Sequence, residues 1–199
     1  MSPDHPQAAS PKLPPLRRIK EATAEDHQRA EDAADLAQAL RSKEDYARCL
    51  QGFHRAWVAI EKWLRDRPDH LPPDMDMRWR AALLQKDLSE LGTTAPPVEA
   101  SFSPLENGRA TVVGVLYVLE GATLGGQIVT RRLQGALEIL PDHGGAFFYG
   151  HGAETGPQWK QFIAWAEARL TDEMEVRQAI AAAKETFSFV QQSFTIEKA

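Results

Sequence analysis

The chain has 199 residues, of which 43% are hydrophobic and 26% are charged, and its formal net charge is -5 at pH 7. These values are typical of one globular domain with a real core, and they exclude a chain that is disordered throughout. The acidic balance argues against nonspecific binding to nucleic acid. The single cysteine, Cys49, excludes an internal disulfide and a cysteine-based zinc or iron–sulfur site, and it favours a reducing, cytoplasmic compartment.

Residues 1–15 are rich in proline and lack an apolar run, so we predict a disordered N-terminal arm followed by one helical domain over residues 16–199. In that domain, helix-forming residues and apolar spacings of three and four predict a series of helices. They cover residues 16–40, 43–66, 77–91, 105–140, 158–170 and 172–195. Proline and glycine predict loops over residues 92–104 and 141–157. No strand pair is indicated, so the predicted fold class is all-α, with one compact multi-helix domain.

The most hydrophobic stretch covers residues 112–129, which is long enough to be weighed as a membrane span. Glu120 lies near its middle and glycines interrupt it, and a buried ionisable group is costly in lipid. We therefore predict a central buried helix and no contact with a membrane.

Several catalytic motifs can be tested and set aside. Gly121 to Gly126 has the glycine spacing of a phosphate-binding loop, but Gln127 and Ile128 stand where lysine and serine or threonine are needed. The Glu-x-x-His pairs of di-iron bundles, the His-Glu-x-x-His zinc motif and the G-x-S-x-G nucleophile turn are absent from the sequence.

Among the histidines, His27 stands out because Glu31 follows it by one helical turn on the same face. A carboxylate at that spacing can accept a proton from one ring nitrogen and leave the other nitrogen free for a metal. The same spacing also suits an ordinary surface ion pair, and the residues alone leave both interpretations open.

Glycines inside the most apolar helix are the second unusual feature, because each costs about 1 kcal/mol relative to alanine in a helix interior. They are Gly114, Gly121, Gly125 and Gly126. Two interpretations remain open. The glycines could allow close packing between helices, or they could let a flat ligand lie against bare backbone beneath a bent helix.

Taken together, these segments resemble heme oxygenases, in particular the bacterial branch associated with phytochromes. IKEATAEDHQRAE is similar to the family's proximal segment, LYVLEGATLGGQIV to its glycine-rich distal helix, and WKQF with AAKETFSFVQQSF to its last two helices. The resemblance covers residues 16–194 and implies a heme oxygenase-like fold, with heme between the first helix and a kinked distal helix.

The resemblance also implies roles for individual residues. His27 matches the heme iron ligand and Glu31 the acid that steadies it. Other positions match the distal backbone, the basic residues near the heme propionates and the aromatic wall of the pocket. These are Gly121, Gly125 and Gly126 for the backbone, Lys20, Lys160 and neighbouring Arg17 for the propionates, and Phe187 and Phe194 for the wall.

One departure concerns proton delivery. Many family members carry an aspartate after the first distal glycine, where this chain has Ala122. Thr123 and main-chain carbonyls freed by the glycines are the candidates here to hold the distal waters.

The leading hypothesis is therefore a heme oxygenase, for which heme is both substrate and cofactor. The resemblance implies cleavage of heme with O2 to biliverdin, CO and ferrous iron. Electrons would come from a partner such as a ferredoxin or a flavoprotein reductase, and a bacterial phytochrome is a candidate recipient of biliverdin. The alternatives are a heme- or bilin-binding protein without turnover, an all-α scaffold without tetrapyrrole, and a helical enzyme of the TenA type acting on another small molecule.

Overall fold

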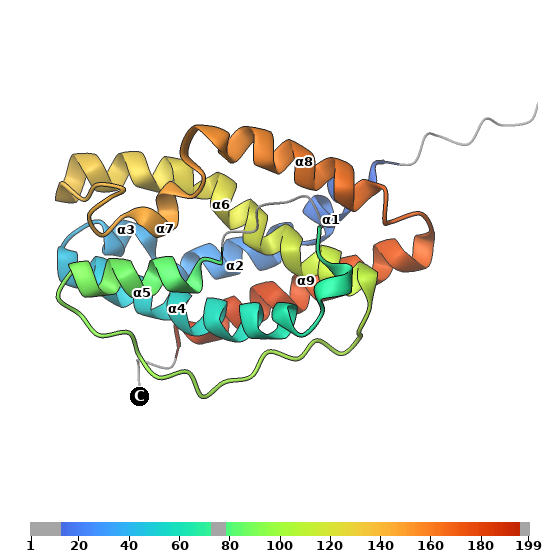
Figure 1. Ribbon diagram of the computed structural model, residues 1–199, viewed down its shortest axis with the longest axis horizontal. Helices are drawn as coiled ribbons and strands as arrows, with labels where there is room; N and C mark the ends of the chain where they lie inside the picture. The colour runs from blue at the N-terminus through green and yellow to red at the C-terminus, as the bar shows by residue number, and fades with distance from the viewer. Residues whose placement is uncertain (1–12, 73–78, 196–199) are drawn as a thin grey trace, which may run out of the picture.

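The computed structural model describes residues 13–72 and 79–195, and within these ranges it contains helices and loops, with isolated β-bridges only at Leu140 (Figure 1). The α-helices are α1 (Pro15–Ala22), α2 (Ala24–Ala34), α3 (Leu36–Ala39), α4 (Lys43–Arg65), α5 (Ala81–Glu90), α6 (Arg109–Leu137), α7 (Ala146–Tyr149), α8 (Thr155–Glu167) and α9 (Glu173–Ser193). Two short 3-10 helices cover Pro68–His70 and Gly152–Glu154. The all-α prediction is confirmed.

The predicted helix over residues 16–40 is wrong as a single element, because the chain divides it into α1, α2 and α3. At the first break the hydroxyl of Thr23 donates to the carbonyl of Ile19 at 2.8 Å. At the second, Asp35 adopts a left-handed conformation (φ 40°), and its carboxylate accepts a hydrogen bond from the backbone N–H of Gln38 at 3.1 Å. Both residues favour local side-chain-to-backbone bonds over continuous helix.

Other boundaries differ by a few residues. The helix predicted over 105–140 begins at Arg109 and ends at Leu137, and the predicted loop 141–157 contains α7. α8 starts at Thr155, three residues earlier than predicted. Most of the predicted arm (residues 1–12) and the predicted start of the third helix (residues 77 and 78) lie outside the described residues.

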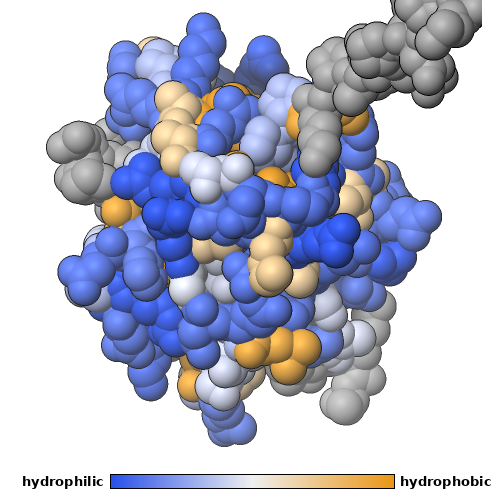
Figure 2. Space-filling view, turned by 90° about the vertical axis from the view of Figure 1, so that its right-hand side faces the viewer, coloured by the Kyte–Doolittle hydropathy of each residue, from blue (hydrophilic) through white to orange (hydrophobic). Residues whose placement is uncertain are grey.

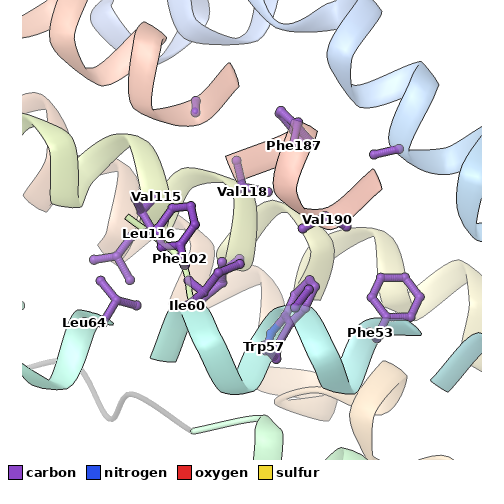
Figure 3. Close-up of a cluster of buried hydrophobic side chains, with 14 of the residues drawn as sticks. Phe53, Trp57, Ile60, Leu64, Phe102, Val115, Leu116, Val118, Phe187 and Val190 are labelled. Atoms are coloured by element: carbon purple, nitrogen blue, oxygen red, sulfur yellow. The ribbon is translucent and has the colours of Figure 1, made fainter. Parts of the chain in front are cut away.

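The core forms where α4, α6 and α9 meet, and Figure 3 shows side chains from all three helices pointing toward one another. Trp57, Ile60 and Leu64 of α4 are at most 1% exposed, as the three- and four-residue spacing predicts. Val115 and Leu116 of α6 are buried to the same degree. This packing holds α6 across the centre of the molecule, with α8 on one side and α9 on the other (Figure 1).

α6 is long and apolar enough to cross a membrane, but 56% of its most apolar window is buried inside the protein. That burial is expected for the core helix of a soluble protein and agrees with the prediction made for residues 112–129. The face of the molecule shown in Figure 2 is mainly hydrophilic, with apolar residues scattered rather than gathered into one patch.

Candidate functional site

His27 lies on α2 with 56% of its side chain exposed, at the junction of α2 with α9. Its ring meets the buried ring of Phe187 edge to face, with centroids 5.5 Å apart. Its Nδ1 lies 3.7 Å from Oε2 of Glu31, the distance of an ion pair rather than of a hydrogen bond. Within residues 13–72 and 79–195, no hydrogen bond engages the other ring nitrogen, Nε2, which is therefore available as a ligand.

A contact between α6 and the start of α2 brings the glycine-rich segment near this histidine. The side chain of Tyr117 on α6 lies next to that of Thr23 at the start of α2. His27 follows Thr23 by one helical turn, and its backbone N–H donates to the Thr23 carbonyl at 2.9 Å. Gly121 follows Tyr117 by one turn on α6. Since one turn rises about 5.4 Å, His27 and Gly121 both lie close to the same contact.

The glycines of α6 fall into two groups. A Cβ built on Gly114 would lie 2.2 Å from the carbonyl oxygen of Ala179, and one on Gly126 would lie 2.5 Å from that of Phe148. At Gly121 and Gly125 such an atom would meet no heavy atom of the described residues within 4 Å. Gly121 and Gly125, which we call the glycine face, therefore border open space, whereas the other two glycines serve helix packing.

The segment after α6 supports the back of this helix. The carboxylate of Asp87 on α5 accepts hydrogen bonds from the backbone N–H groups of Ala146 and Phe147, at 2.9 and 2.8 Å. Burial raises the pKa of Asp87 to about 6, although both N–H donors favour its charged form. On the other side of α7, Gln127 donates through its side chain to the Tyr149 carbonyl at 2.6 Å. Together these bonds fix α7 against α6 near Gly126.

The predicted basic residues lie on helices that pack together, since α1 contacts α8. Lys20 on α1 and Lys160 on α8 are both exposed. Arg17 pairs with Glu21 at 3.2 Å, and Arg18 donates to both carboxylate oxygens of Glu173 at 3.0 and 2.6 Å. In the described part of the chain, Lys20 is the one cation of the 17–20 cluster that forms no ion pair.

The two predicted aromatic residues occupy different places. Phe187 contacts the ring of His27, and its role as a wall residue stays a prediction. Phe194 instead fills the notch above Gly52, where an added Cβ would lie 2.3 Å from the Phe194 ring. It also meets Phe53 edge to face at 5.0 Å. Phe194 thus holds the end of α9 against α4.

Thr123 and Ala122 lie beside the glycine face, and neither side chain offers a free hydrogen-bond donor. The hydroxyl of buried Thr123 donates to the Leu119 carbonyl at 3.1 Å, so toward water it would act as an acceptor. Ala122 is partly buried against the core.

Two further polar residues near this segment were missed from the sequence. Arg80 is 5% exposed and Glu120 is 8% exposed, and the positive charge of Arg80 lowers the pKa of Glu120 while burial raises it more, to about 7. Glu120 was noticed only as an argument against a membrane span. The sequence does not single out Arg80 as a candidate site residue, because a single arginine near the start of a helix is common.

Cavities elsewhere in the described residues do not include the site. One of about 440 Å³ is lined by residues around α5 and α7, among them Trp79 and Tyr149. Another, of about 590 Å³, is polar and includes Arg109 and Arg169. The fold and the site thus define an all-α protein with an exposed histidine beside an open stretch of helix backbone.

Comparison with known proteins identifies the family. The model of the heme oxygenase family matches residues 15–195. A heme oxygenase of Xanthomonas campestris pv. campestris (strain 8004) is 32% identical over 155 residues, which cover 77% of this chain and 90% of that protein. Heme oxygenase PigA of Pseudomonas aeruginosa is 25% identical over 173 residues, covering 86% of this chain and 87% of PigA. The chain therefore belongs to the heme oxygenase family.

Solved structures agree on the fold. The NO- and CO-bound heme oxygenase of Neisseria meningitidis superposes with a TM-score of 0.79 at 23% identity, over 94% of this chain and 96% of that one. The heme oxygenase of Leptospira interrogans gives a TM-score of 0.69 at 19% identity, over 92% and 99%. The predicted fold class, a single heme oxygenase-like helical domain, is confirmed.

Proposed function

We propose that this protein binds heme between α2 and α6 and cleaves it with O2 and external electrons to biliverdin, CO and ferrous iron. The observation that carries the proposal is the pairing of His27 with the glycine face near one contact between α2 and α6. An imidazole nitrogen is a suitable iron ligand. The missing Cβ atoms at Gly121 and Gly125 let a flat macrocycle approach the helix backbone.

The residues fit heme in three ways. His27 holds the iron through Nε2, while Glu31 faces Nδ1 and orients the ring. Lys20, Lys160 and Arg17 balance the two propionates, which a chain of net charge -5 would otherwise repel. Phe187 packs edge to face against the histidine ring and restricts its position.

The chemistry of oxygen activation belongs to the iron of the bound substrate, and the protein contributes binding, orientation and exclusion. The glycine face leaves room beside the backbone of α6, a helix that bends along its length in Figure 1. Electrons come from a ferredoxin or a flavoprotein reductase, and a bacterial phytochrome is a candidate recipient of the product.

The test is hemin titration of the purified chain, followed by addition of reductant under air. We expect a Soret band that converts to a biliverdin spectrum, and loss of both in His27→Ala. His143→Ala, which changes an exposed loop histidine, is the matched control and should behave like the wild type.

Two results would contradict the proposal. A stable Soret band that never converts would favour a heme-binding protein without turnover, for which Ala122 is the motivating feature. An unchanged spectrum and activity in His27→Ala would exclude His27 as the iron ligand.

A further inference from the structure

Arg80 occupies a buried position behind α6. Its Nη1 donates to the Phe147 carbonyl at 2.8 Å, and its backbone N–H donates to the Glu61 carboxylate at 2.5 Å. Its charge lowers the pKa of Glu120 and of Glu61, although burial of each carboxyl raises it more. Arg80 thus contacts α7 directly and attracts carboxylates from both α6 and α4.

The space around the guanidinium is filled on the side of α7. A Cβ on Gly150, which has a positive φ of 64°, would lie 3.1 Å from Nη2 of Arg80 and 3.0 Å from Cγ2 of Thr123. Arg80, Thr123 and the chain after α7 are therefore packed together. Glu120 and Thr123 are three residues apart, on one side of α6, and each is a near neighbour of the glycine face along the chain.

Stability alone does not explain a charged group at this place. Exchanging buried ion pairs for apolar side chains of similar volume is often neutral or stabilising. A hydrogen bond from a buried guanidinium does, however, restrict the position of the group that it holds, here the Phe147 carbonyl, because its energy depends steeply on geometry.

We propose that Arg80 is a positioning residue of the heme oxygenase reaction. Its guanidinium holds the Phe147 carbonyl of α7 and packs beside Thr123 of α6, and so fixes the rotation and depth of the glycine face. The inference rests on the proposed function, because its consequence is read on bound heme.

The experiment compares Arg80→Met, Arg80→Lys, Glu120→Gln and the double variant Arg80→Met/Glu120→Gln with wild type. Arg48→Met, on the exposed side of α4, is the control for loss of an ion-paired arginine. Hemin affinity should stay within about threefold of wild type, because His27 is unchanged, while kcat falls about 10- to 100-fold in Arg80→Met. The ratio of biliverdin isomers should shift, and Arg80→Lys should show a smaller effect because lysine lacks the planar fork.

A second readout needs no heme. Amide hydrogen exchange over residues 117–127 should be faster in the heme-free Arg80→Met chain than in wild type. The double variant should regain thermal stability, because no carboxyl remains at position 120 without the positive charge of Arg80, but it should regain neither kcat nor the isomer ratio. Recovery of stability without recovery of turnover would exclude a purely structural role for Arg80.

The inference would be overturned if kcat, isomer ratio and amide exchange of Arg80→Met all matched those of wild type. It would also be overturned if the double variant regained turnover together with stability. If Arg80→Met fails to fold, Arg80→Lys gives the same readouts, because lysine cannot reproduce the planar fork that holds the Phe147 carbonyl. A wild-type chain that neither binds nor converts heme would refute the proposed function instead, and amide exchange would still test the role of Arg80.

Discussion

Gly114 and Gly121 look alike in the sequence, since each interrupts the helix-forming run of α6. They are seven residues apart, close to two full turns, and therefore point to the same side of the helix. At Gly114 that side touches the backbone of α9 at Ala179, and at Gly121 it borders open space. The same residue type thus allows close packing in the first half of α6 and leaves room for a ligand in the second.

The largest expected loss of stability is at Gly114, where α6 and α9 pack closely. In Gly114→Ala the new methyl group would meet the Ala179 carbonyl oxygen at 2.2 Å, and because the obstacle is backbone, α6 and α9 must separate. Overpacking of this kind costs about 3 kcal/mol. For a chain of this size that lowers Tm by about 6–12 °C, measurable by circular dichroism. A Tm equal to that of wild type would show that α6 and α9 pack less closely than described.

Gly126→Ala should destabilise the fold less. Its methyl group would lie 2.5 Å from the Phe148 carbonyl oxygen, but α7 has four residues and α9 has 21, so fewer packed residues must move. We expect a loss of about 1–2 kcal/mol by chemical denaturation. A loss as large as that of Gly114→Ala would mean that α7 is held as rigidly as α9.

Sequence patterns predicted the helices well where apolar spacing is regular, as in α4 and α9, because burial of one stripe decides those elements. They failed at Thr23 and Asp35, where local hydrogen bonds of ordinary polar residues end a helix. For the site, the spacing to Glu31 made His27 a candidate, and the resemblance to heme oxygenases gave it the role of iron ligand, which stays a prediction. Arg80 could not be selected, because its contacts depend on α6 and α7 meeting in three dimensions, which no local pattern records.

The pH dependence of stability tests the burial of Glu120, which lies between the closely packed first half of α6 and its open second half. Burial raises the pKa of Glu120 from 4.5 to about 7, so the folded chain holds this proton more tightly than the unfolded chain does. Its contribution to stability is fully present below pH 4.5 and is lost as pH rises to about 7. Relative to Glu120→Gln, the wild-type free energy of unfolding should therefore fall by about 2 kcal/mol over that range.

Urea titrations of both proteins at several pH values measure this difference. Asp87, whose pKa is also raised, contributes a parallel fall in both proteins and cancels. Parallel curves for wild type and variant between pH 4.5 and 7 would show that Glu120 is not buried as described.

Gly121→Ala should stabilise the heme-free protein, whereas Gly114→Ala should destabilise it. With no atom of the described residues within 4 Å of the new methyl group, the heme-free protein should gain about 1 kcal/mol from better helix propensity. Heme turnover should nevertheless fall about tenfold, because the methyl group lies between the backbone and the ligand. Differential scanning calorimetry and the biliverdin assay measure the two effects. A gain in stability with unchanged turnover would place heme away from this glycine.

The smallest effect, and the sharpest control, is expected at Gly135. It also borders open space, but it lies in the last turn of α6, beyond the segment near His27. Gly135→Ala should stabilise the chain by about 0.5 kcal/mol, since propensity matters less where a helix frays, and heme affinity and turnover should stay at wild-type values. If turnover also fell in Gly135→Ala, open space beside a glycine would no longer identify the heme site, and the separation of α6 into two halves would lose its functional meaning. If only Gly121→Ala and Gly125→Ala reduce turnover, the ligand is confined to the turn of α6 that follows the Tyr117–Thr23 contact.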